Sequence, residues 1–488
     1  ITDAHLMPDA LSAVPGNLVV GSGGVITPHA AAQALNLNVV DDLTIEAGGA
    51  IHADSYGYYM SGPGYTLTGE RDGGSHGGQG GNADSTDSQG PCYGLFLAPV
   101  DFGSGSVNGT GLYGGGAIGI VVGGTLAVNG TGVISANGMG YNESSGSGGS
   151  VYIQADALTG DGTIRADGGP HDSYGAGGGG GRVAVLLTGS GDFSSFGGSL
   201  QAYADSYSSQ NGAGGTVYRE TAADGAGDGG VYVDFGNVAT AMHVELPPTY
   251  GAFTEDLSGV TFYLRQGGKV GLYGDVAIGG LDMAAGSVLY GNGYQLTLNS
   301  LADAGTIDLD NGGVTLALNG NATLASATLS GTGTLTKAGT GILTLGANYG
   351  TDLIVDEGTL RIASGTTITG NTTVNGGRLE IDNGAIDGTL TVAGGTLAIG
   401  SSPGQATVVD LDIQAGGTFE VDLAGLAAGS GYDQVIVTGS TTLAGALNLI
   451  LAPGFEPGLE DSFTIIDGSN PIVTAFSDGD FVLAGGFK

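Results

Sequence analysis

One short pattern occurs three times in the first half of the chain, as ISANG at 134–138, IRADG at 164–168 and LQAYA at 200–204. After each copy come a polar loop, a glycine cluster and a run rich in β-branched or aromatic residues. These runs are SVYI at 150–153, RVAV at 182–185 and TVY at 216–218. Repetition with a period of roughly 20–50 residues is typical of solenoid proteins, in which each unit buries its apolar face against its neighbours. The repeat therefore predicts a β-solenoid.

The composition fits an all-β protein. Glycine accounts for 102 of the 488 residues without a Gly-X-Y period, which excludes collagen. Hydrophobic residues make up 41% of the chain, and this content argues against disorder. The glycines separate short runs of Val, Ile, Leu, Thr and Tyr, where turns and close backbone contacts favour glycine. Only PHAAAQALNL at 28–37 and the short segment 423–428 have a helical pattern, so we expect helix at these two places alone.

The chain is strongly acidic. Acidic residues outnumber basic ones by 47 to 10, which gives a net charge of −37. Such a surface repels nucleic acid, anionic membranes and anionic polysaccharides, and it favours solubility and the binding of divalent cations. No stretch approaches the ~20 apolar residues of a membrane-spanning helix. The sequence therefore predicts no nucleic-acid partner and no membrane span.

Cysteine content and the first residue bear on localisation. Cys92 has no second cysteine with which to form an internal disulfide, and no histidine lies near it in a recognisable nucleophile motif. A disulfide scaffold is therefore a poor fit, whereas a secreted bacterial solenoid needs none. The sequence opens on Ile1 rather than Met, so we expect an extracellular protein from which a signal peptide has been removed.

Changes in pattern divide the chain into five predicted regions. Residues 1–40 contain little glycine in their first part and are expected to cap the first rung or to pair with a neighbouring subunit. A glycine-rich β-solenoid follows at 41–240, with a long loop insertion at 56–116. The remaining regions are an intermediate β-solenoid at 241–330, regular repeats at 331–452 and a C-terminal β cap at 453–488.

The regular repeats resemble a known family. GTLTKAGTGILTL at 333–345 looks like the passenger-associated transport repeat of bacterial autotransporter proteins. GTLAIGSSPG at 395–404 and YDQVIV at 432–437 look like the segments that follow that repeat. In the first half, segments such as GGTLAVNG at 123–130 resemble a glycine-rich β-helical repeat of large bacterial surface proteins. The sequence departs from the autotransporter pattern at its end, because no outer-membrane barrel pattern follows the repeats up to Lys488; we expect that the translocation unit is missing, was cleaved or never existed.

The resemblance implies a right-handed β-helix that is exported to the cell surface, and it assigns no activity. Together with the repeats, it leads to one predicted fold. We expect an all-β chain that forms a right-handed parallel β-helix (β-solenoid), with glycine-rich rungs and an atypical N-terminal segment.

Enzyme activity has little support in the sequence. A lyase or glycosidase needs carboxylates that converge on one face, usually with Arg or Lys for a charged substrate. Three D-x-D pairs place two carboxylates on one strand face, and no basic residue lies beside any of them. The pairs are Asp308/Asp310, Asp410/Asp412 and Asp478/Asp480. We interpret these residues as solvent-facing parts of the rungs and predict that the protein is not an enzyme.

Repeated Asp-Ser pairs in the loops form a candidate metal site. Asp54, Asp172 and Asp205 each precede Ser and Tyr, at what we interpret as equivalent loop positions after a rung. Stacking would align carboxylate and hydroxyl oxygens along one edge, and such oxygens suit calcium, a hard cation. Alternatively, the pairs form Asx-type turns and the tyrosines pack against the protein. Both interpretations fit the sequence, and no other cofactor is indicated.

Two functions fit a long acidic β-solenoid. The first, which we favour from sequence, is a structural subunit that assembles head to tail into a surface filament or matrix fibre, because two unlike ends can form an open heterologous contact. Its candidate contact residues are Ile1, Leu6 and Leu11. The alternative is an adhesin whose rigid stalk presents tyrosine- and glycine-rich loops to a cell-surface or glycan ligand. Its candidate contact residues are Tyr56, Tyr58 and Tyr59.

Overall fold

The computed structural model describes most of the chain. The described residues are 4–7, 12–29, 32–65, 72–83, 89–106, 112–141, 144–171, 175–205, 210–400, 403–472 and 474–477. The chain divides into two compact units, Ile1–Leu289 and Tyr290–Lys488. Each unit is considered below by itself.

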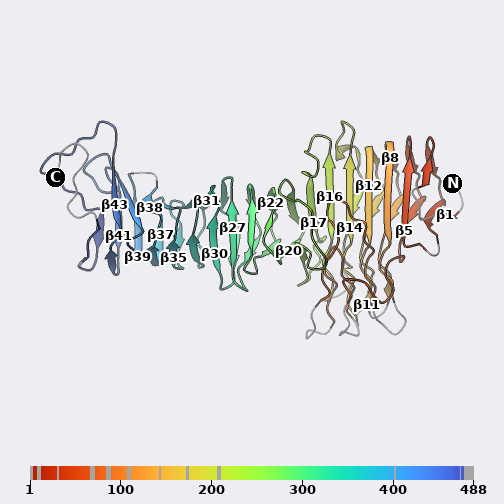
Figure 1. Cartoon of the computed structure of the whole chain (residues 1–488), viewed down its shortest axis with the longest axis horizontal. Coiled ribbons are helices and arrows are strands. Elements are labelled where there is room, and N and C mark those ends of the chain that lie inside the picture. The colour runs from red at the N-terminus through yellow and green to blue at the C-terminus, as the bar shows by residue number, and fades with distance from the viewer. Residues whose placement is uncertain are drawn as a thin grey trace. The chain divides into compact units, whose positions relative to one another are not determined.

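Both units consist of β-strands that pair mostly in parallel, as Figure 1 shows. Within the described ranges, the only helical element is a single 3-10 turn, η1 (Phe193–Ser195). No helix in this part of the chain is long and apolar enough to span a membrane. The all-β prediction is therefore confirmed, together with the predominance of parallel strands.

The two predicted helices are wrong. The described part of segment 28–37 contains the end of strand β4 (Val25–Pro28) and the start of β5 (Ala34–Val39). Buried and half-buried residues alternate along β5, so its period of two outweighs the helical propensity of the alanines. Segment 423–428 begins at the last residue of β40 (Thr418–Leu423) and continues as bends.

Unit 1 contains two parallel sheets that receive strands in turn along the chain. The order in the first sheet is β1 (Ala4–Met7), β4, β7 (Ala50–His52), β9 (Val133–Ser135), β13 (Thr163–Arg165) and β15 (Ser199–Gln201). The order in the second sheet is β2 (Ser12–Val14), β5, β8 (Ala117–Val128), β12 (Ser150–Gly160), β14 (Arg182–Leu187), β16 (Thr216–Thr221), β17 (Gly230–Asp234), β19 (Thr261–Arg265) and β22 (Gly280–Met283). Only the pairing of β16 with β17 is antiparallel within this second series.

Shorter strands complete unit 1. Strand β3 (Leu18–Val20) pairs with β6 (Leu43–Ile45), which in turn pairs with β8. Strand β18 (Val244–Leu246) pairs with β20 (Lys269–Leu272), and β10 (Gly140–Tyr141) forms a small antiparallel pair with β11 (Ser144–Ser145). Figure 1 shows β5, β8, β12, β14 and β16 lying side by side, with the segments around β11 projecting from one end of these strands.

The register of the first sheet confirms that the three ISANG-like segments are equivalent. Ile134 of β9 is paired with Ile51 of β7 on one side and with Ile164 of β13 on the other, and Ile164 is paired with Leu200 of β15. The three isoleucines are fully buried and contribute to one continuous apolar core. A period of roughly 30 residues therefore returns the chain to the same place in the sheet.

Unit 2 also has parallel sheets that receive strands in turn along the chain, and fewer residues separate its paired strands. One of its sheets has the order β24 (Gln295–Leu298), β27 (Val314–Leu318), β30 (Thr334–Ala338), β32 (Asp352–Val355), β35 (Thr372–Val374), β37 (Ala385–Val392), β39 (Gln405–Ile413), β41 (Gln434–Val437) and β44 (Ile466–Gly468). Another has the order β28 (Ala322–Leu324), β31 (Ile342–Leu345), β33 (Thr359–Ile362), β36 (Arg378–Ile381), β38 (Thr396–Ile399), β40 and β43 (Ala446–Leu451). Leu343, Leu360, Leu379, Leu397 and Phe419 follow one another in register across the second sheet, and each is buried.

Aspartate and asparagine side chains in both units form hydrogen bonds to the backbone of the segment that pairs next in the sheet. Asp42 Oδ1 accepts the backbone N–H of Thr125 at 2.8 Å in unit 1. In unit 2, Asp352 Oδ1 accepts the N–H of Asn371 at 2.7 Å, and Asn371 Oδ1 accepts the N–H of Thr389 at 3.0 Å. Each such bond satisfies a backbone donor next to a strand end or a shift in the register of the sheet.

The D-x-D pairs have the same structural use. Asp310 Oδ1 accepts the N–H of Thr332 at 3.0 Å, and Asp410 Oδ1 accepts the N–H of Ser440 at 2.7 Å. Asp308 is half-buried and accepts the hydroxyl of Ser330. Asp478 and Asp480 lie outside the described residues. In the two described pairs, the carboxylates accept hydrogen bonds from neighbouring backbone and hydroxyl groups and, at Asp412, from the side-chain amide of Gln414.

Candidate ligand-binding site

A glycine-rich body projects from one end of the strands of unit 1. We call it the glycine-rich lobe. It consists of the segment between β7 and β8 and of the loops that follow β9, β13 and β15. Its described residues are 57–65, 72–83, 89–106, 112–116, 136–141, 144–149, 166–171, 175–181, 202–205 and 210–215. It is the part drawn around β11 in Figure 1.

Backbone hydrogen bonds hold the segments of the lobe together outside the strands. Gly74 N–H donates to the carbonyl of Ser145 at 2.9 Å, and Gly78 N–H donates to that of Gly180 at 2.9 Å. Gly180 N–H in turn donates to the carbonyl of Ala213 at 2.9 Å. Segments that lie far apart in the sequence thus satisfy one another's backbone groups. The described parts of the insertion are more ordered than the lateral loop that the sequence predicts.

Close backbone contact explains the glycine content of the lobe. A Cβ atom at Gly77 would lie under 3.0 Å from the carbonyl oxygen of Gly181, and one at Gly78 would lie as close to that of Gly214. Gly81, three residues after Gly78, approaches Gln210 in the same way. The lobe therefore has a backbone framework that leaves its few large side chains at defined positions.

A fully buried arginine attaches the lobe to the second sheet. Arg182 begins β14, and its Nε donates to the carbonyl of Tyr93 at 2.9 Å while Nη1 donates to Thr216 Oγ1 at 3.0 Å. The guanidinium carbon lies 4.2 Å from the centre of the Phe96 ring, a cation–π contact. Burial lowers the pKa of Arg182 from its ordinary value. Such a group nonetheless stays charged near pH 7 because an arginine titrates far above neutrality.

Two buried or half-buried glutamates fix the segment that contains Cys92. Glu245 Oε2 accepts the N–H of Cys92 at 3.0 Å, and Glu255 accepts the N–H groups of Phe96 and Leu97 at 2.7 and 2.9 Å. Cys92 is completely buried, and burial raises the pKa of its thiol. A buried thiol that is kept protonated is unreactive. The cysteine therefore belongs to the packing of the lobe.

His76 lies in the centre of the lobe and is fully buried. Its Nδ1 lies 2.8 Å from the carbonyl oxygen of Gly148, so Nδ1 carries the proton. Burial, with a smaller contribution from the positive charge of Arg182, lowers the pKa of His76 to about 3. The imidazole is therefore neutral, and Nε2 is a hydrogen-bond acceptor. This atom is buried and has no hydrogen-bond partner among the described residues.

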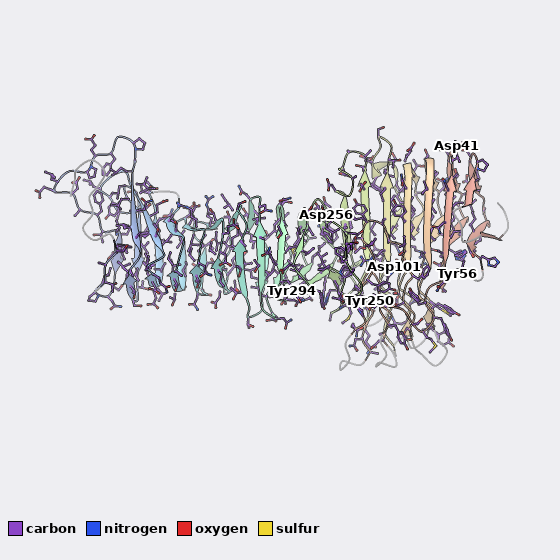
Figure 2. All side chains as sticks on the ribbon, in the orientation of Figure 1. Asp41, Tyr56, Asp101, Tyr250, Asp256 and Tyr294 are labelled. Atoms are coloured by element: carbon purple, nitrogen blue, oxygen red, sulfur yellow. The ribbon has the colours of Figure 1, made fainter. Side chains whose placement is uncertain are left out.

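A cavity of about 200 Å³ opens against Tyr93, whose ring lies 4.5 Å from that of His76; His76 itself is not part of the lining. Aromatic side chains form much of its wall: Tyr93 and Tyr250 are 6.3 Å apart in an edge-to-face arrangement, and Phe253 lies next to them. Asp101 supplies the acidic side chain of the lining, and burial raises the pKa of its carboxyl group. Figure 2 labels Asp101 and Tyr250, which come from segments about 150 residues apart in sequence. The remaining lining residues are Pro63, Gly94, Leu95, Pro248, Gly251 and Ala252.

The three tyrosines predicted as ligand contacts have different surroundings. Tyr56 is half-buried, and its hydroxyl lies 2.9 Å from Thr27 Oγ1 in β4. Tyr58 packs edge-on against Phe102 at 5.7 Å. Tyr59 is 47% exposed and lies 4.6 Å from the ring of Tyr113, which is 40% exposed. Of the three, Tyr59 alone presents its ring broadly to solvent, and Tyr113 is a partner that the sequence prediction missed.

The residues predicted to bind calcium are only partly brought together. The register places Asn137 and Asp167, not Asp205, at the positions equivalent to Asp54, because each of these three residues lies three positions after a paired isoleucine. Asp172 lies outside the described residues. Asp54 and Asp205 nevertheless line one cavity of about 500 Å³, together with Asp167 and Arg165 among others.

The carboxylates around this second cavity already have partners. Asp54 accepts the hydroxyl of Ser135 at 2.9 Å and the N–H of Asn137 at 2.6 Å. Asp205 accepts the N–H of His171 at 2.9 Å, and its Oδ2 also lies 2.9 Å from the imidazole Nδ1. Within the described ranges, no group of three or more His, Cys, Asp or Glu residues has the geometry to hold a metal ion. Calcium binding at Asp54, Asp172 and Asp205 stays a prediction.

The residues predicted for head-to-tail assembly lie at the start of unit 1. Leu6 belongs to β1, where its backbone is paired with Thr27 of β4. Ile1 and Leu11 lie outside the described residues. No family model matches this chain, and no curated protein is similar to it at a significant level. Its function is therefore inferred from the geometry of the lobe and of the sheets.

Proposed function

We infer that this chain is an extracellular binding protein of the adhesin type, without enzymatic activity. In this proposal the two units are right-handed parallel β-helices, similar to autotransporter passengers, that serve as a stalk for the glycine-rich lobe. The in-register pairing of residues one winding apart supports the β-helix. The lobe is the part that contacts a cell-surface or glycan ligand.

One observation carries the proposal: the lobe is an ordered platform with aromatic rings on its surface. Tyr59 and Tyr113 form an exposed pair on a framework whose segments are fixed by backbone hydrogen bonds. Tyrosines on a rigid framework offer a large contact area and lose little conformational entropy on binding.

Charge restricts the class of partner. A net charge of −37 disfavours anionic polysaccharides and anionic membranes, and nothing in it opposes a neutral glycan or an uncharged surface. The proposed ligand is therefore a neutral glycan-bearing surface.

The test uses fluorescently labelled full-length chain on glass coated with dextran, mannan or galactan, with alginate as the anionic comparison. We expect binding to at least one neutral coating, and loss of that binding in a variant that carries Tyr59→Ala and Tyr113→Ala. Tyr294→Ala is the matched control because it removes a tyrosine of unit 2 that is 37% exposed. Equal binding by the double variant and the wild type would refute the proposal.

Assembly into a filament is a second candidate, supported by open sheet edges. Among the described residues, β1 and β2 each pair along one edge only, and so do β43 and β44. Strand edges of this kind are templates for pairing with another chain. Negative-stain electron microscopy of the purified chain separates the candidates: long fibres of uniform width support the filament, whereas single rods exclude it under those conditions.

A further inference from the structure

We propose that the cavity lined by Tyr93, Asp101, Tyr250 and Phe253 binds one ring of a neutral carbohydrate. This inference deepens the proposed function and rests on it. It assigns the chemical class of the ligand and a site separate from the exposed Tyr59–Tyr113 pair. The assignment comes from three features of the cavity: its walls, its polar atoms and the charge around it.

The walls suit a flat, partly apolar ring. Tyr93 is almost fully buried and anchored, since its hydroxyl donates to the carbonyl of Phe102 at 2.6 Å and contacts Ser104 Oγ at 2.8 Å. Tyr250 is 55% exposed and stands at the mouth, where it offers one ring face. Aromatic faces favour C–H groups, which a pyranose ring presents on its apolar side. A volume of about 200 Å³ is below the ~300–1,000 Å³ of sites for drug-sized ligands, so it accommodates a single ring.

The polar atoms at the cavity are hydrogen-bond acceptors. The Asp101 carboxylate lines the cavity, is half-buried and accepts no hydrogen bond from any described residue. A side chain at Gly94, which lines the cavity, would place its Cβ 2.8 Å from Asp101 Oδ2 and 3.2 Å from His76 Nε2. The two oxygens of the Asp101 carboxylate, beside a glycine that leaves room for a ligand, suit a ligand with adjacent donors, and vicinal hydroxyl groups supply them.

Local charge favours a neutral ligand over an ion. The buried guanidinium of Arg182 acts on Asp101 by opposing the rise of its pKa, so the carboxylate is partly compensated. The positive charge of Arg182, behind the cavity wall, would repel an organic cation, and the Asp101 carboxylate would repel an anion. A metal ion would find too few ligands, because no set of three His, Cys, Asp or Glu residues in the described ranges can hold one.

The experiment titrates the full chain with the methyl glycosides of mannose, galactose and glucose, followed by ligand-observed NMR and calorimetry. We expect at least one glycoside to bind. Asp101→Asn keeps the shape of the side chain and should weaken binding about tenfold, the effect expected for one hydrogen bond to a charged acceptor. Tyr250→Ala should weaken binding by a similar factor of about ten through loss of the stacking face. Tyr294→Ala should leave binding unchanged, and circular dichroism checks the fold of every variant.

The outcomes separate this inference from the proposed function. Weakened binding in both cavity variants, with the control unchanged, supports it. Failure of every glycoside to bind, binding that survives both substitutions, or binding of tetramethylammonium in their place overturns it. If no glycoside binds but the labelled protein still adheres to a coated surface through Tyr59 and Tyr113, the cavity inference is wrong and the proposed function stands. If a glycoside binds but the labelled protein adheres to no coated surface, the proposed function is wrong.

Discussion

Acid should loosen the glycine-rich lobe by protonating His76. The folded protein holds the pKa of this histidine at about 3, against about 6.5 for an unperturbed histidine. The unfolded lobe therefore binds more protons in this range, so stability falls as the pH falls. The stability that the lobe gains from a neutral His76 is fully present above about pH 6.5 and is lost progressively toward pH 3. Protonation would also leave the ring next to the fixed charge of Arg182, which adds to the cost.

The size of the effect follows from the two pKa values. Between pH 7 and pH 4, linkage predicts a loss of about 3 kcal/mol from His76, which corresponds to roughly a 200-fold increase in the opening equilibrium. His243 acts in the same direction because burial lowers its pKa to about 4. Asp101 and Asp167 act in the opposite direction, since burial raises the pKa of both carboxyl groups. A comparison of wild type with a His76 variant removes these other contributions.

The assay is hydrogen exchange of peptides from residues 72–83, corrected for the intrinsic rate at each pH. The perturbation is His76→Gln, which retains a donor for Gly148 and cannot be protonated. Wild-type protection in this segment should fall about 200-fold more between pH 7 and pH 4 than the protection of the variant. Peptides from β30 and β31 in unit 2 serve as the internal control. Equal pH dependence in the two proteins would refute the assignment of a neutral, buried His76.

Three further predictions follow from the packing and the charges. Gly77→Ala should lower the free energy of unfolding by more than about 2 kcal/mol and abolish exchange protection in the lobe, because the added Cβ would overlap a carbonyl oxygen. Gly191→Ala is the control and should change the free energy of unfolding by less than about 0.5 kcal/mol, since no atom lies within 4 Å of its Cβ. Glu380→Gln should destabilise unit 2 by about 1 kcal/mol at low salt, and less at high salt, because Glu380 bridges two arginines. Burial alone would raise the pKa of Glu380, but the hydrogen bonds and charges of those arginines outweigh it and hold the pKa below its ordinary value. The stabilisation should therefore be present at neutral pH and disappear as the pH falls below the ordinary glutamate range, as followed by thermal unfolding. Chelation with EDTA should leave the unfolding temperature unchanged, since backbone and hydroxyl donors already occupy Asp54; a decrease reversed by calcium would favour the calcium site.

The repeating strands were predictable because their signal is local. Apolar and polar residues alternate along segments such as 34–39, and an isoleucine recurs three residues before an acid or an amide. Both patterns depend only on neighbouring residues. The register then follows, because a shift of one residue would expose Ile134 and Ile164. Segment 28–37 misled the helix prediction because alanine propensity is weak compared with pairing to β8.

The lobe and its cavity were not predictable in the same way. Gly77 must be glycine because of Gly181, about 100 residues later, and no local pattern reveals such a contact. The cavity combines residues near 93–101 with residues near 248–253, and only the fold brings them together. Alignment by the Asp-Ser pairs matched Asp205 with Asp54, which is wrong because the number of residues between the paired strand residue and the Asp-Ser pair differs from one segment to the next. Counting three residues from each buried isoleucine identifies Asn137 and Asp167 instead.

The central claim is that the glycine-rich lobe, rather than the sheets, contacts the ligand. Hydrogen exchange of the full chain with and without a neutral polysaccharide, chosen as the coating that binds the labelled protein, tests it directly. The account predicts slower exchange in residues 89–106 and 112–116, and no change in peptides from β30 to β40 of unit 2. Protection confined to unit 2 or to the edge strands β1 and β2, with the lobe unaffected, would contradict it.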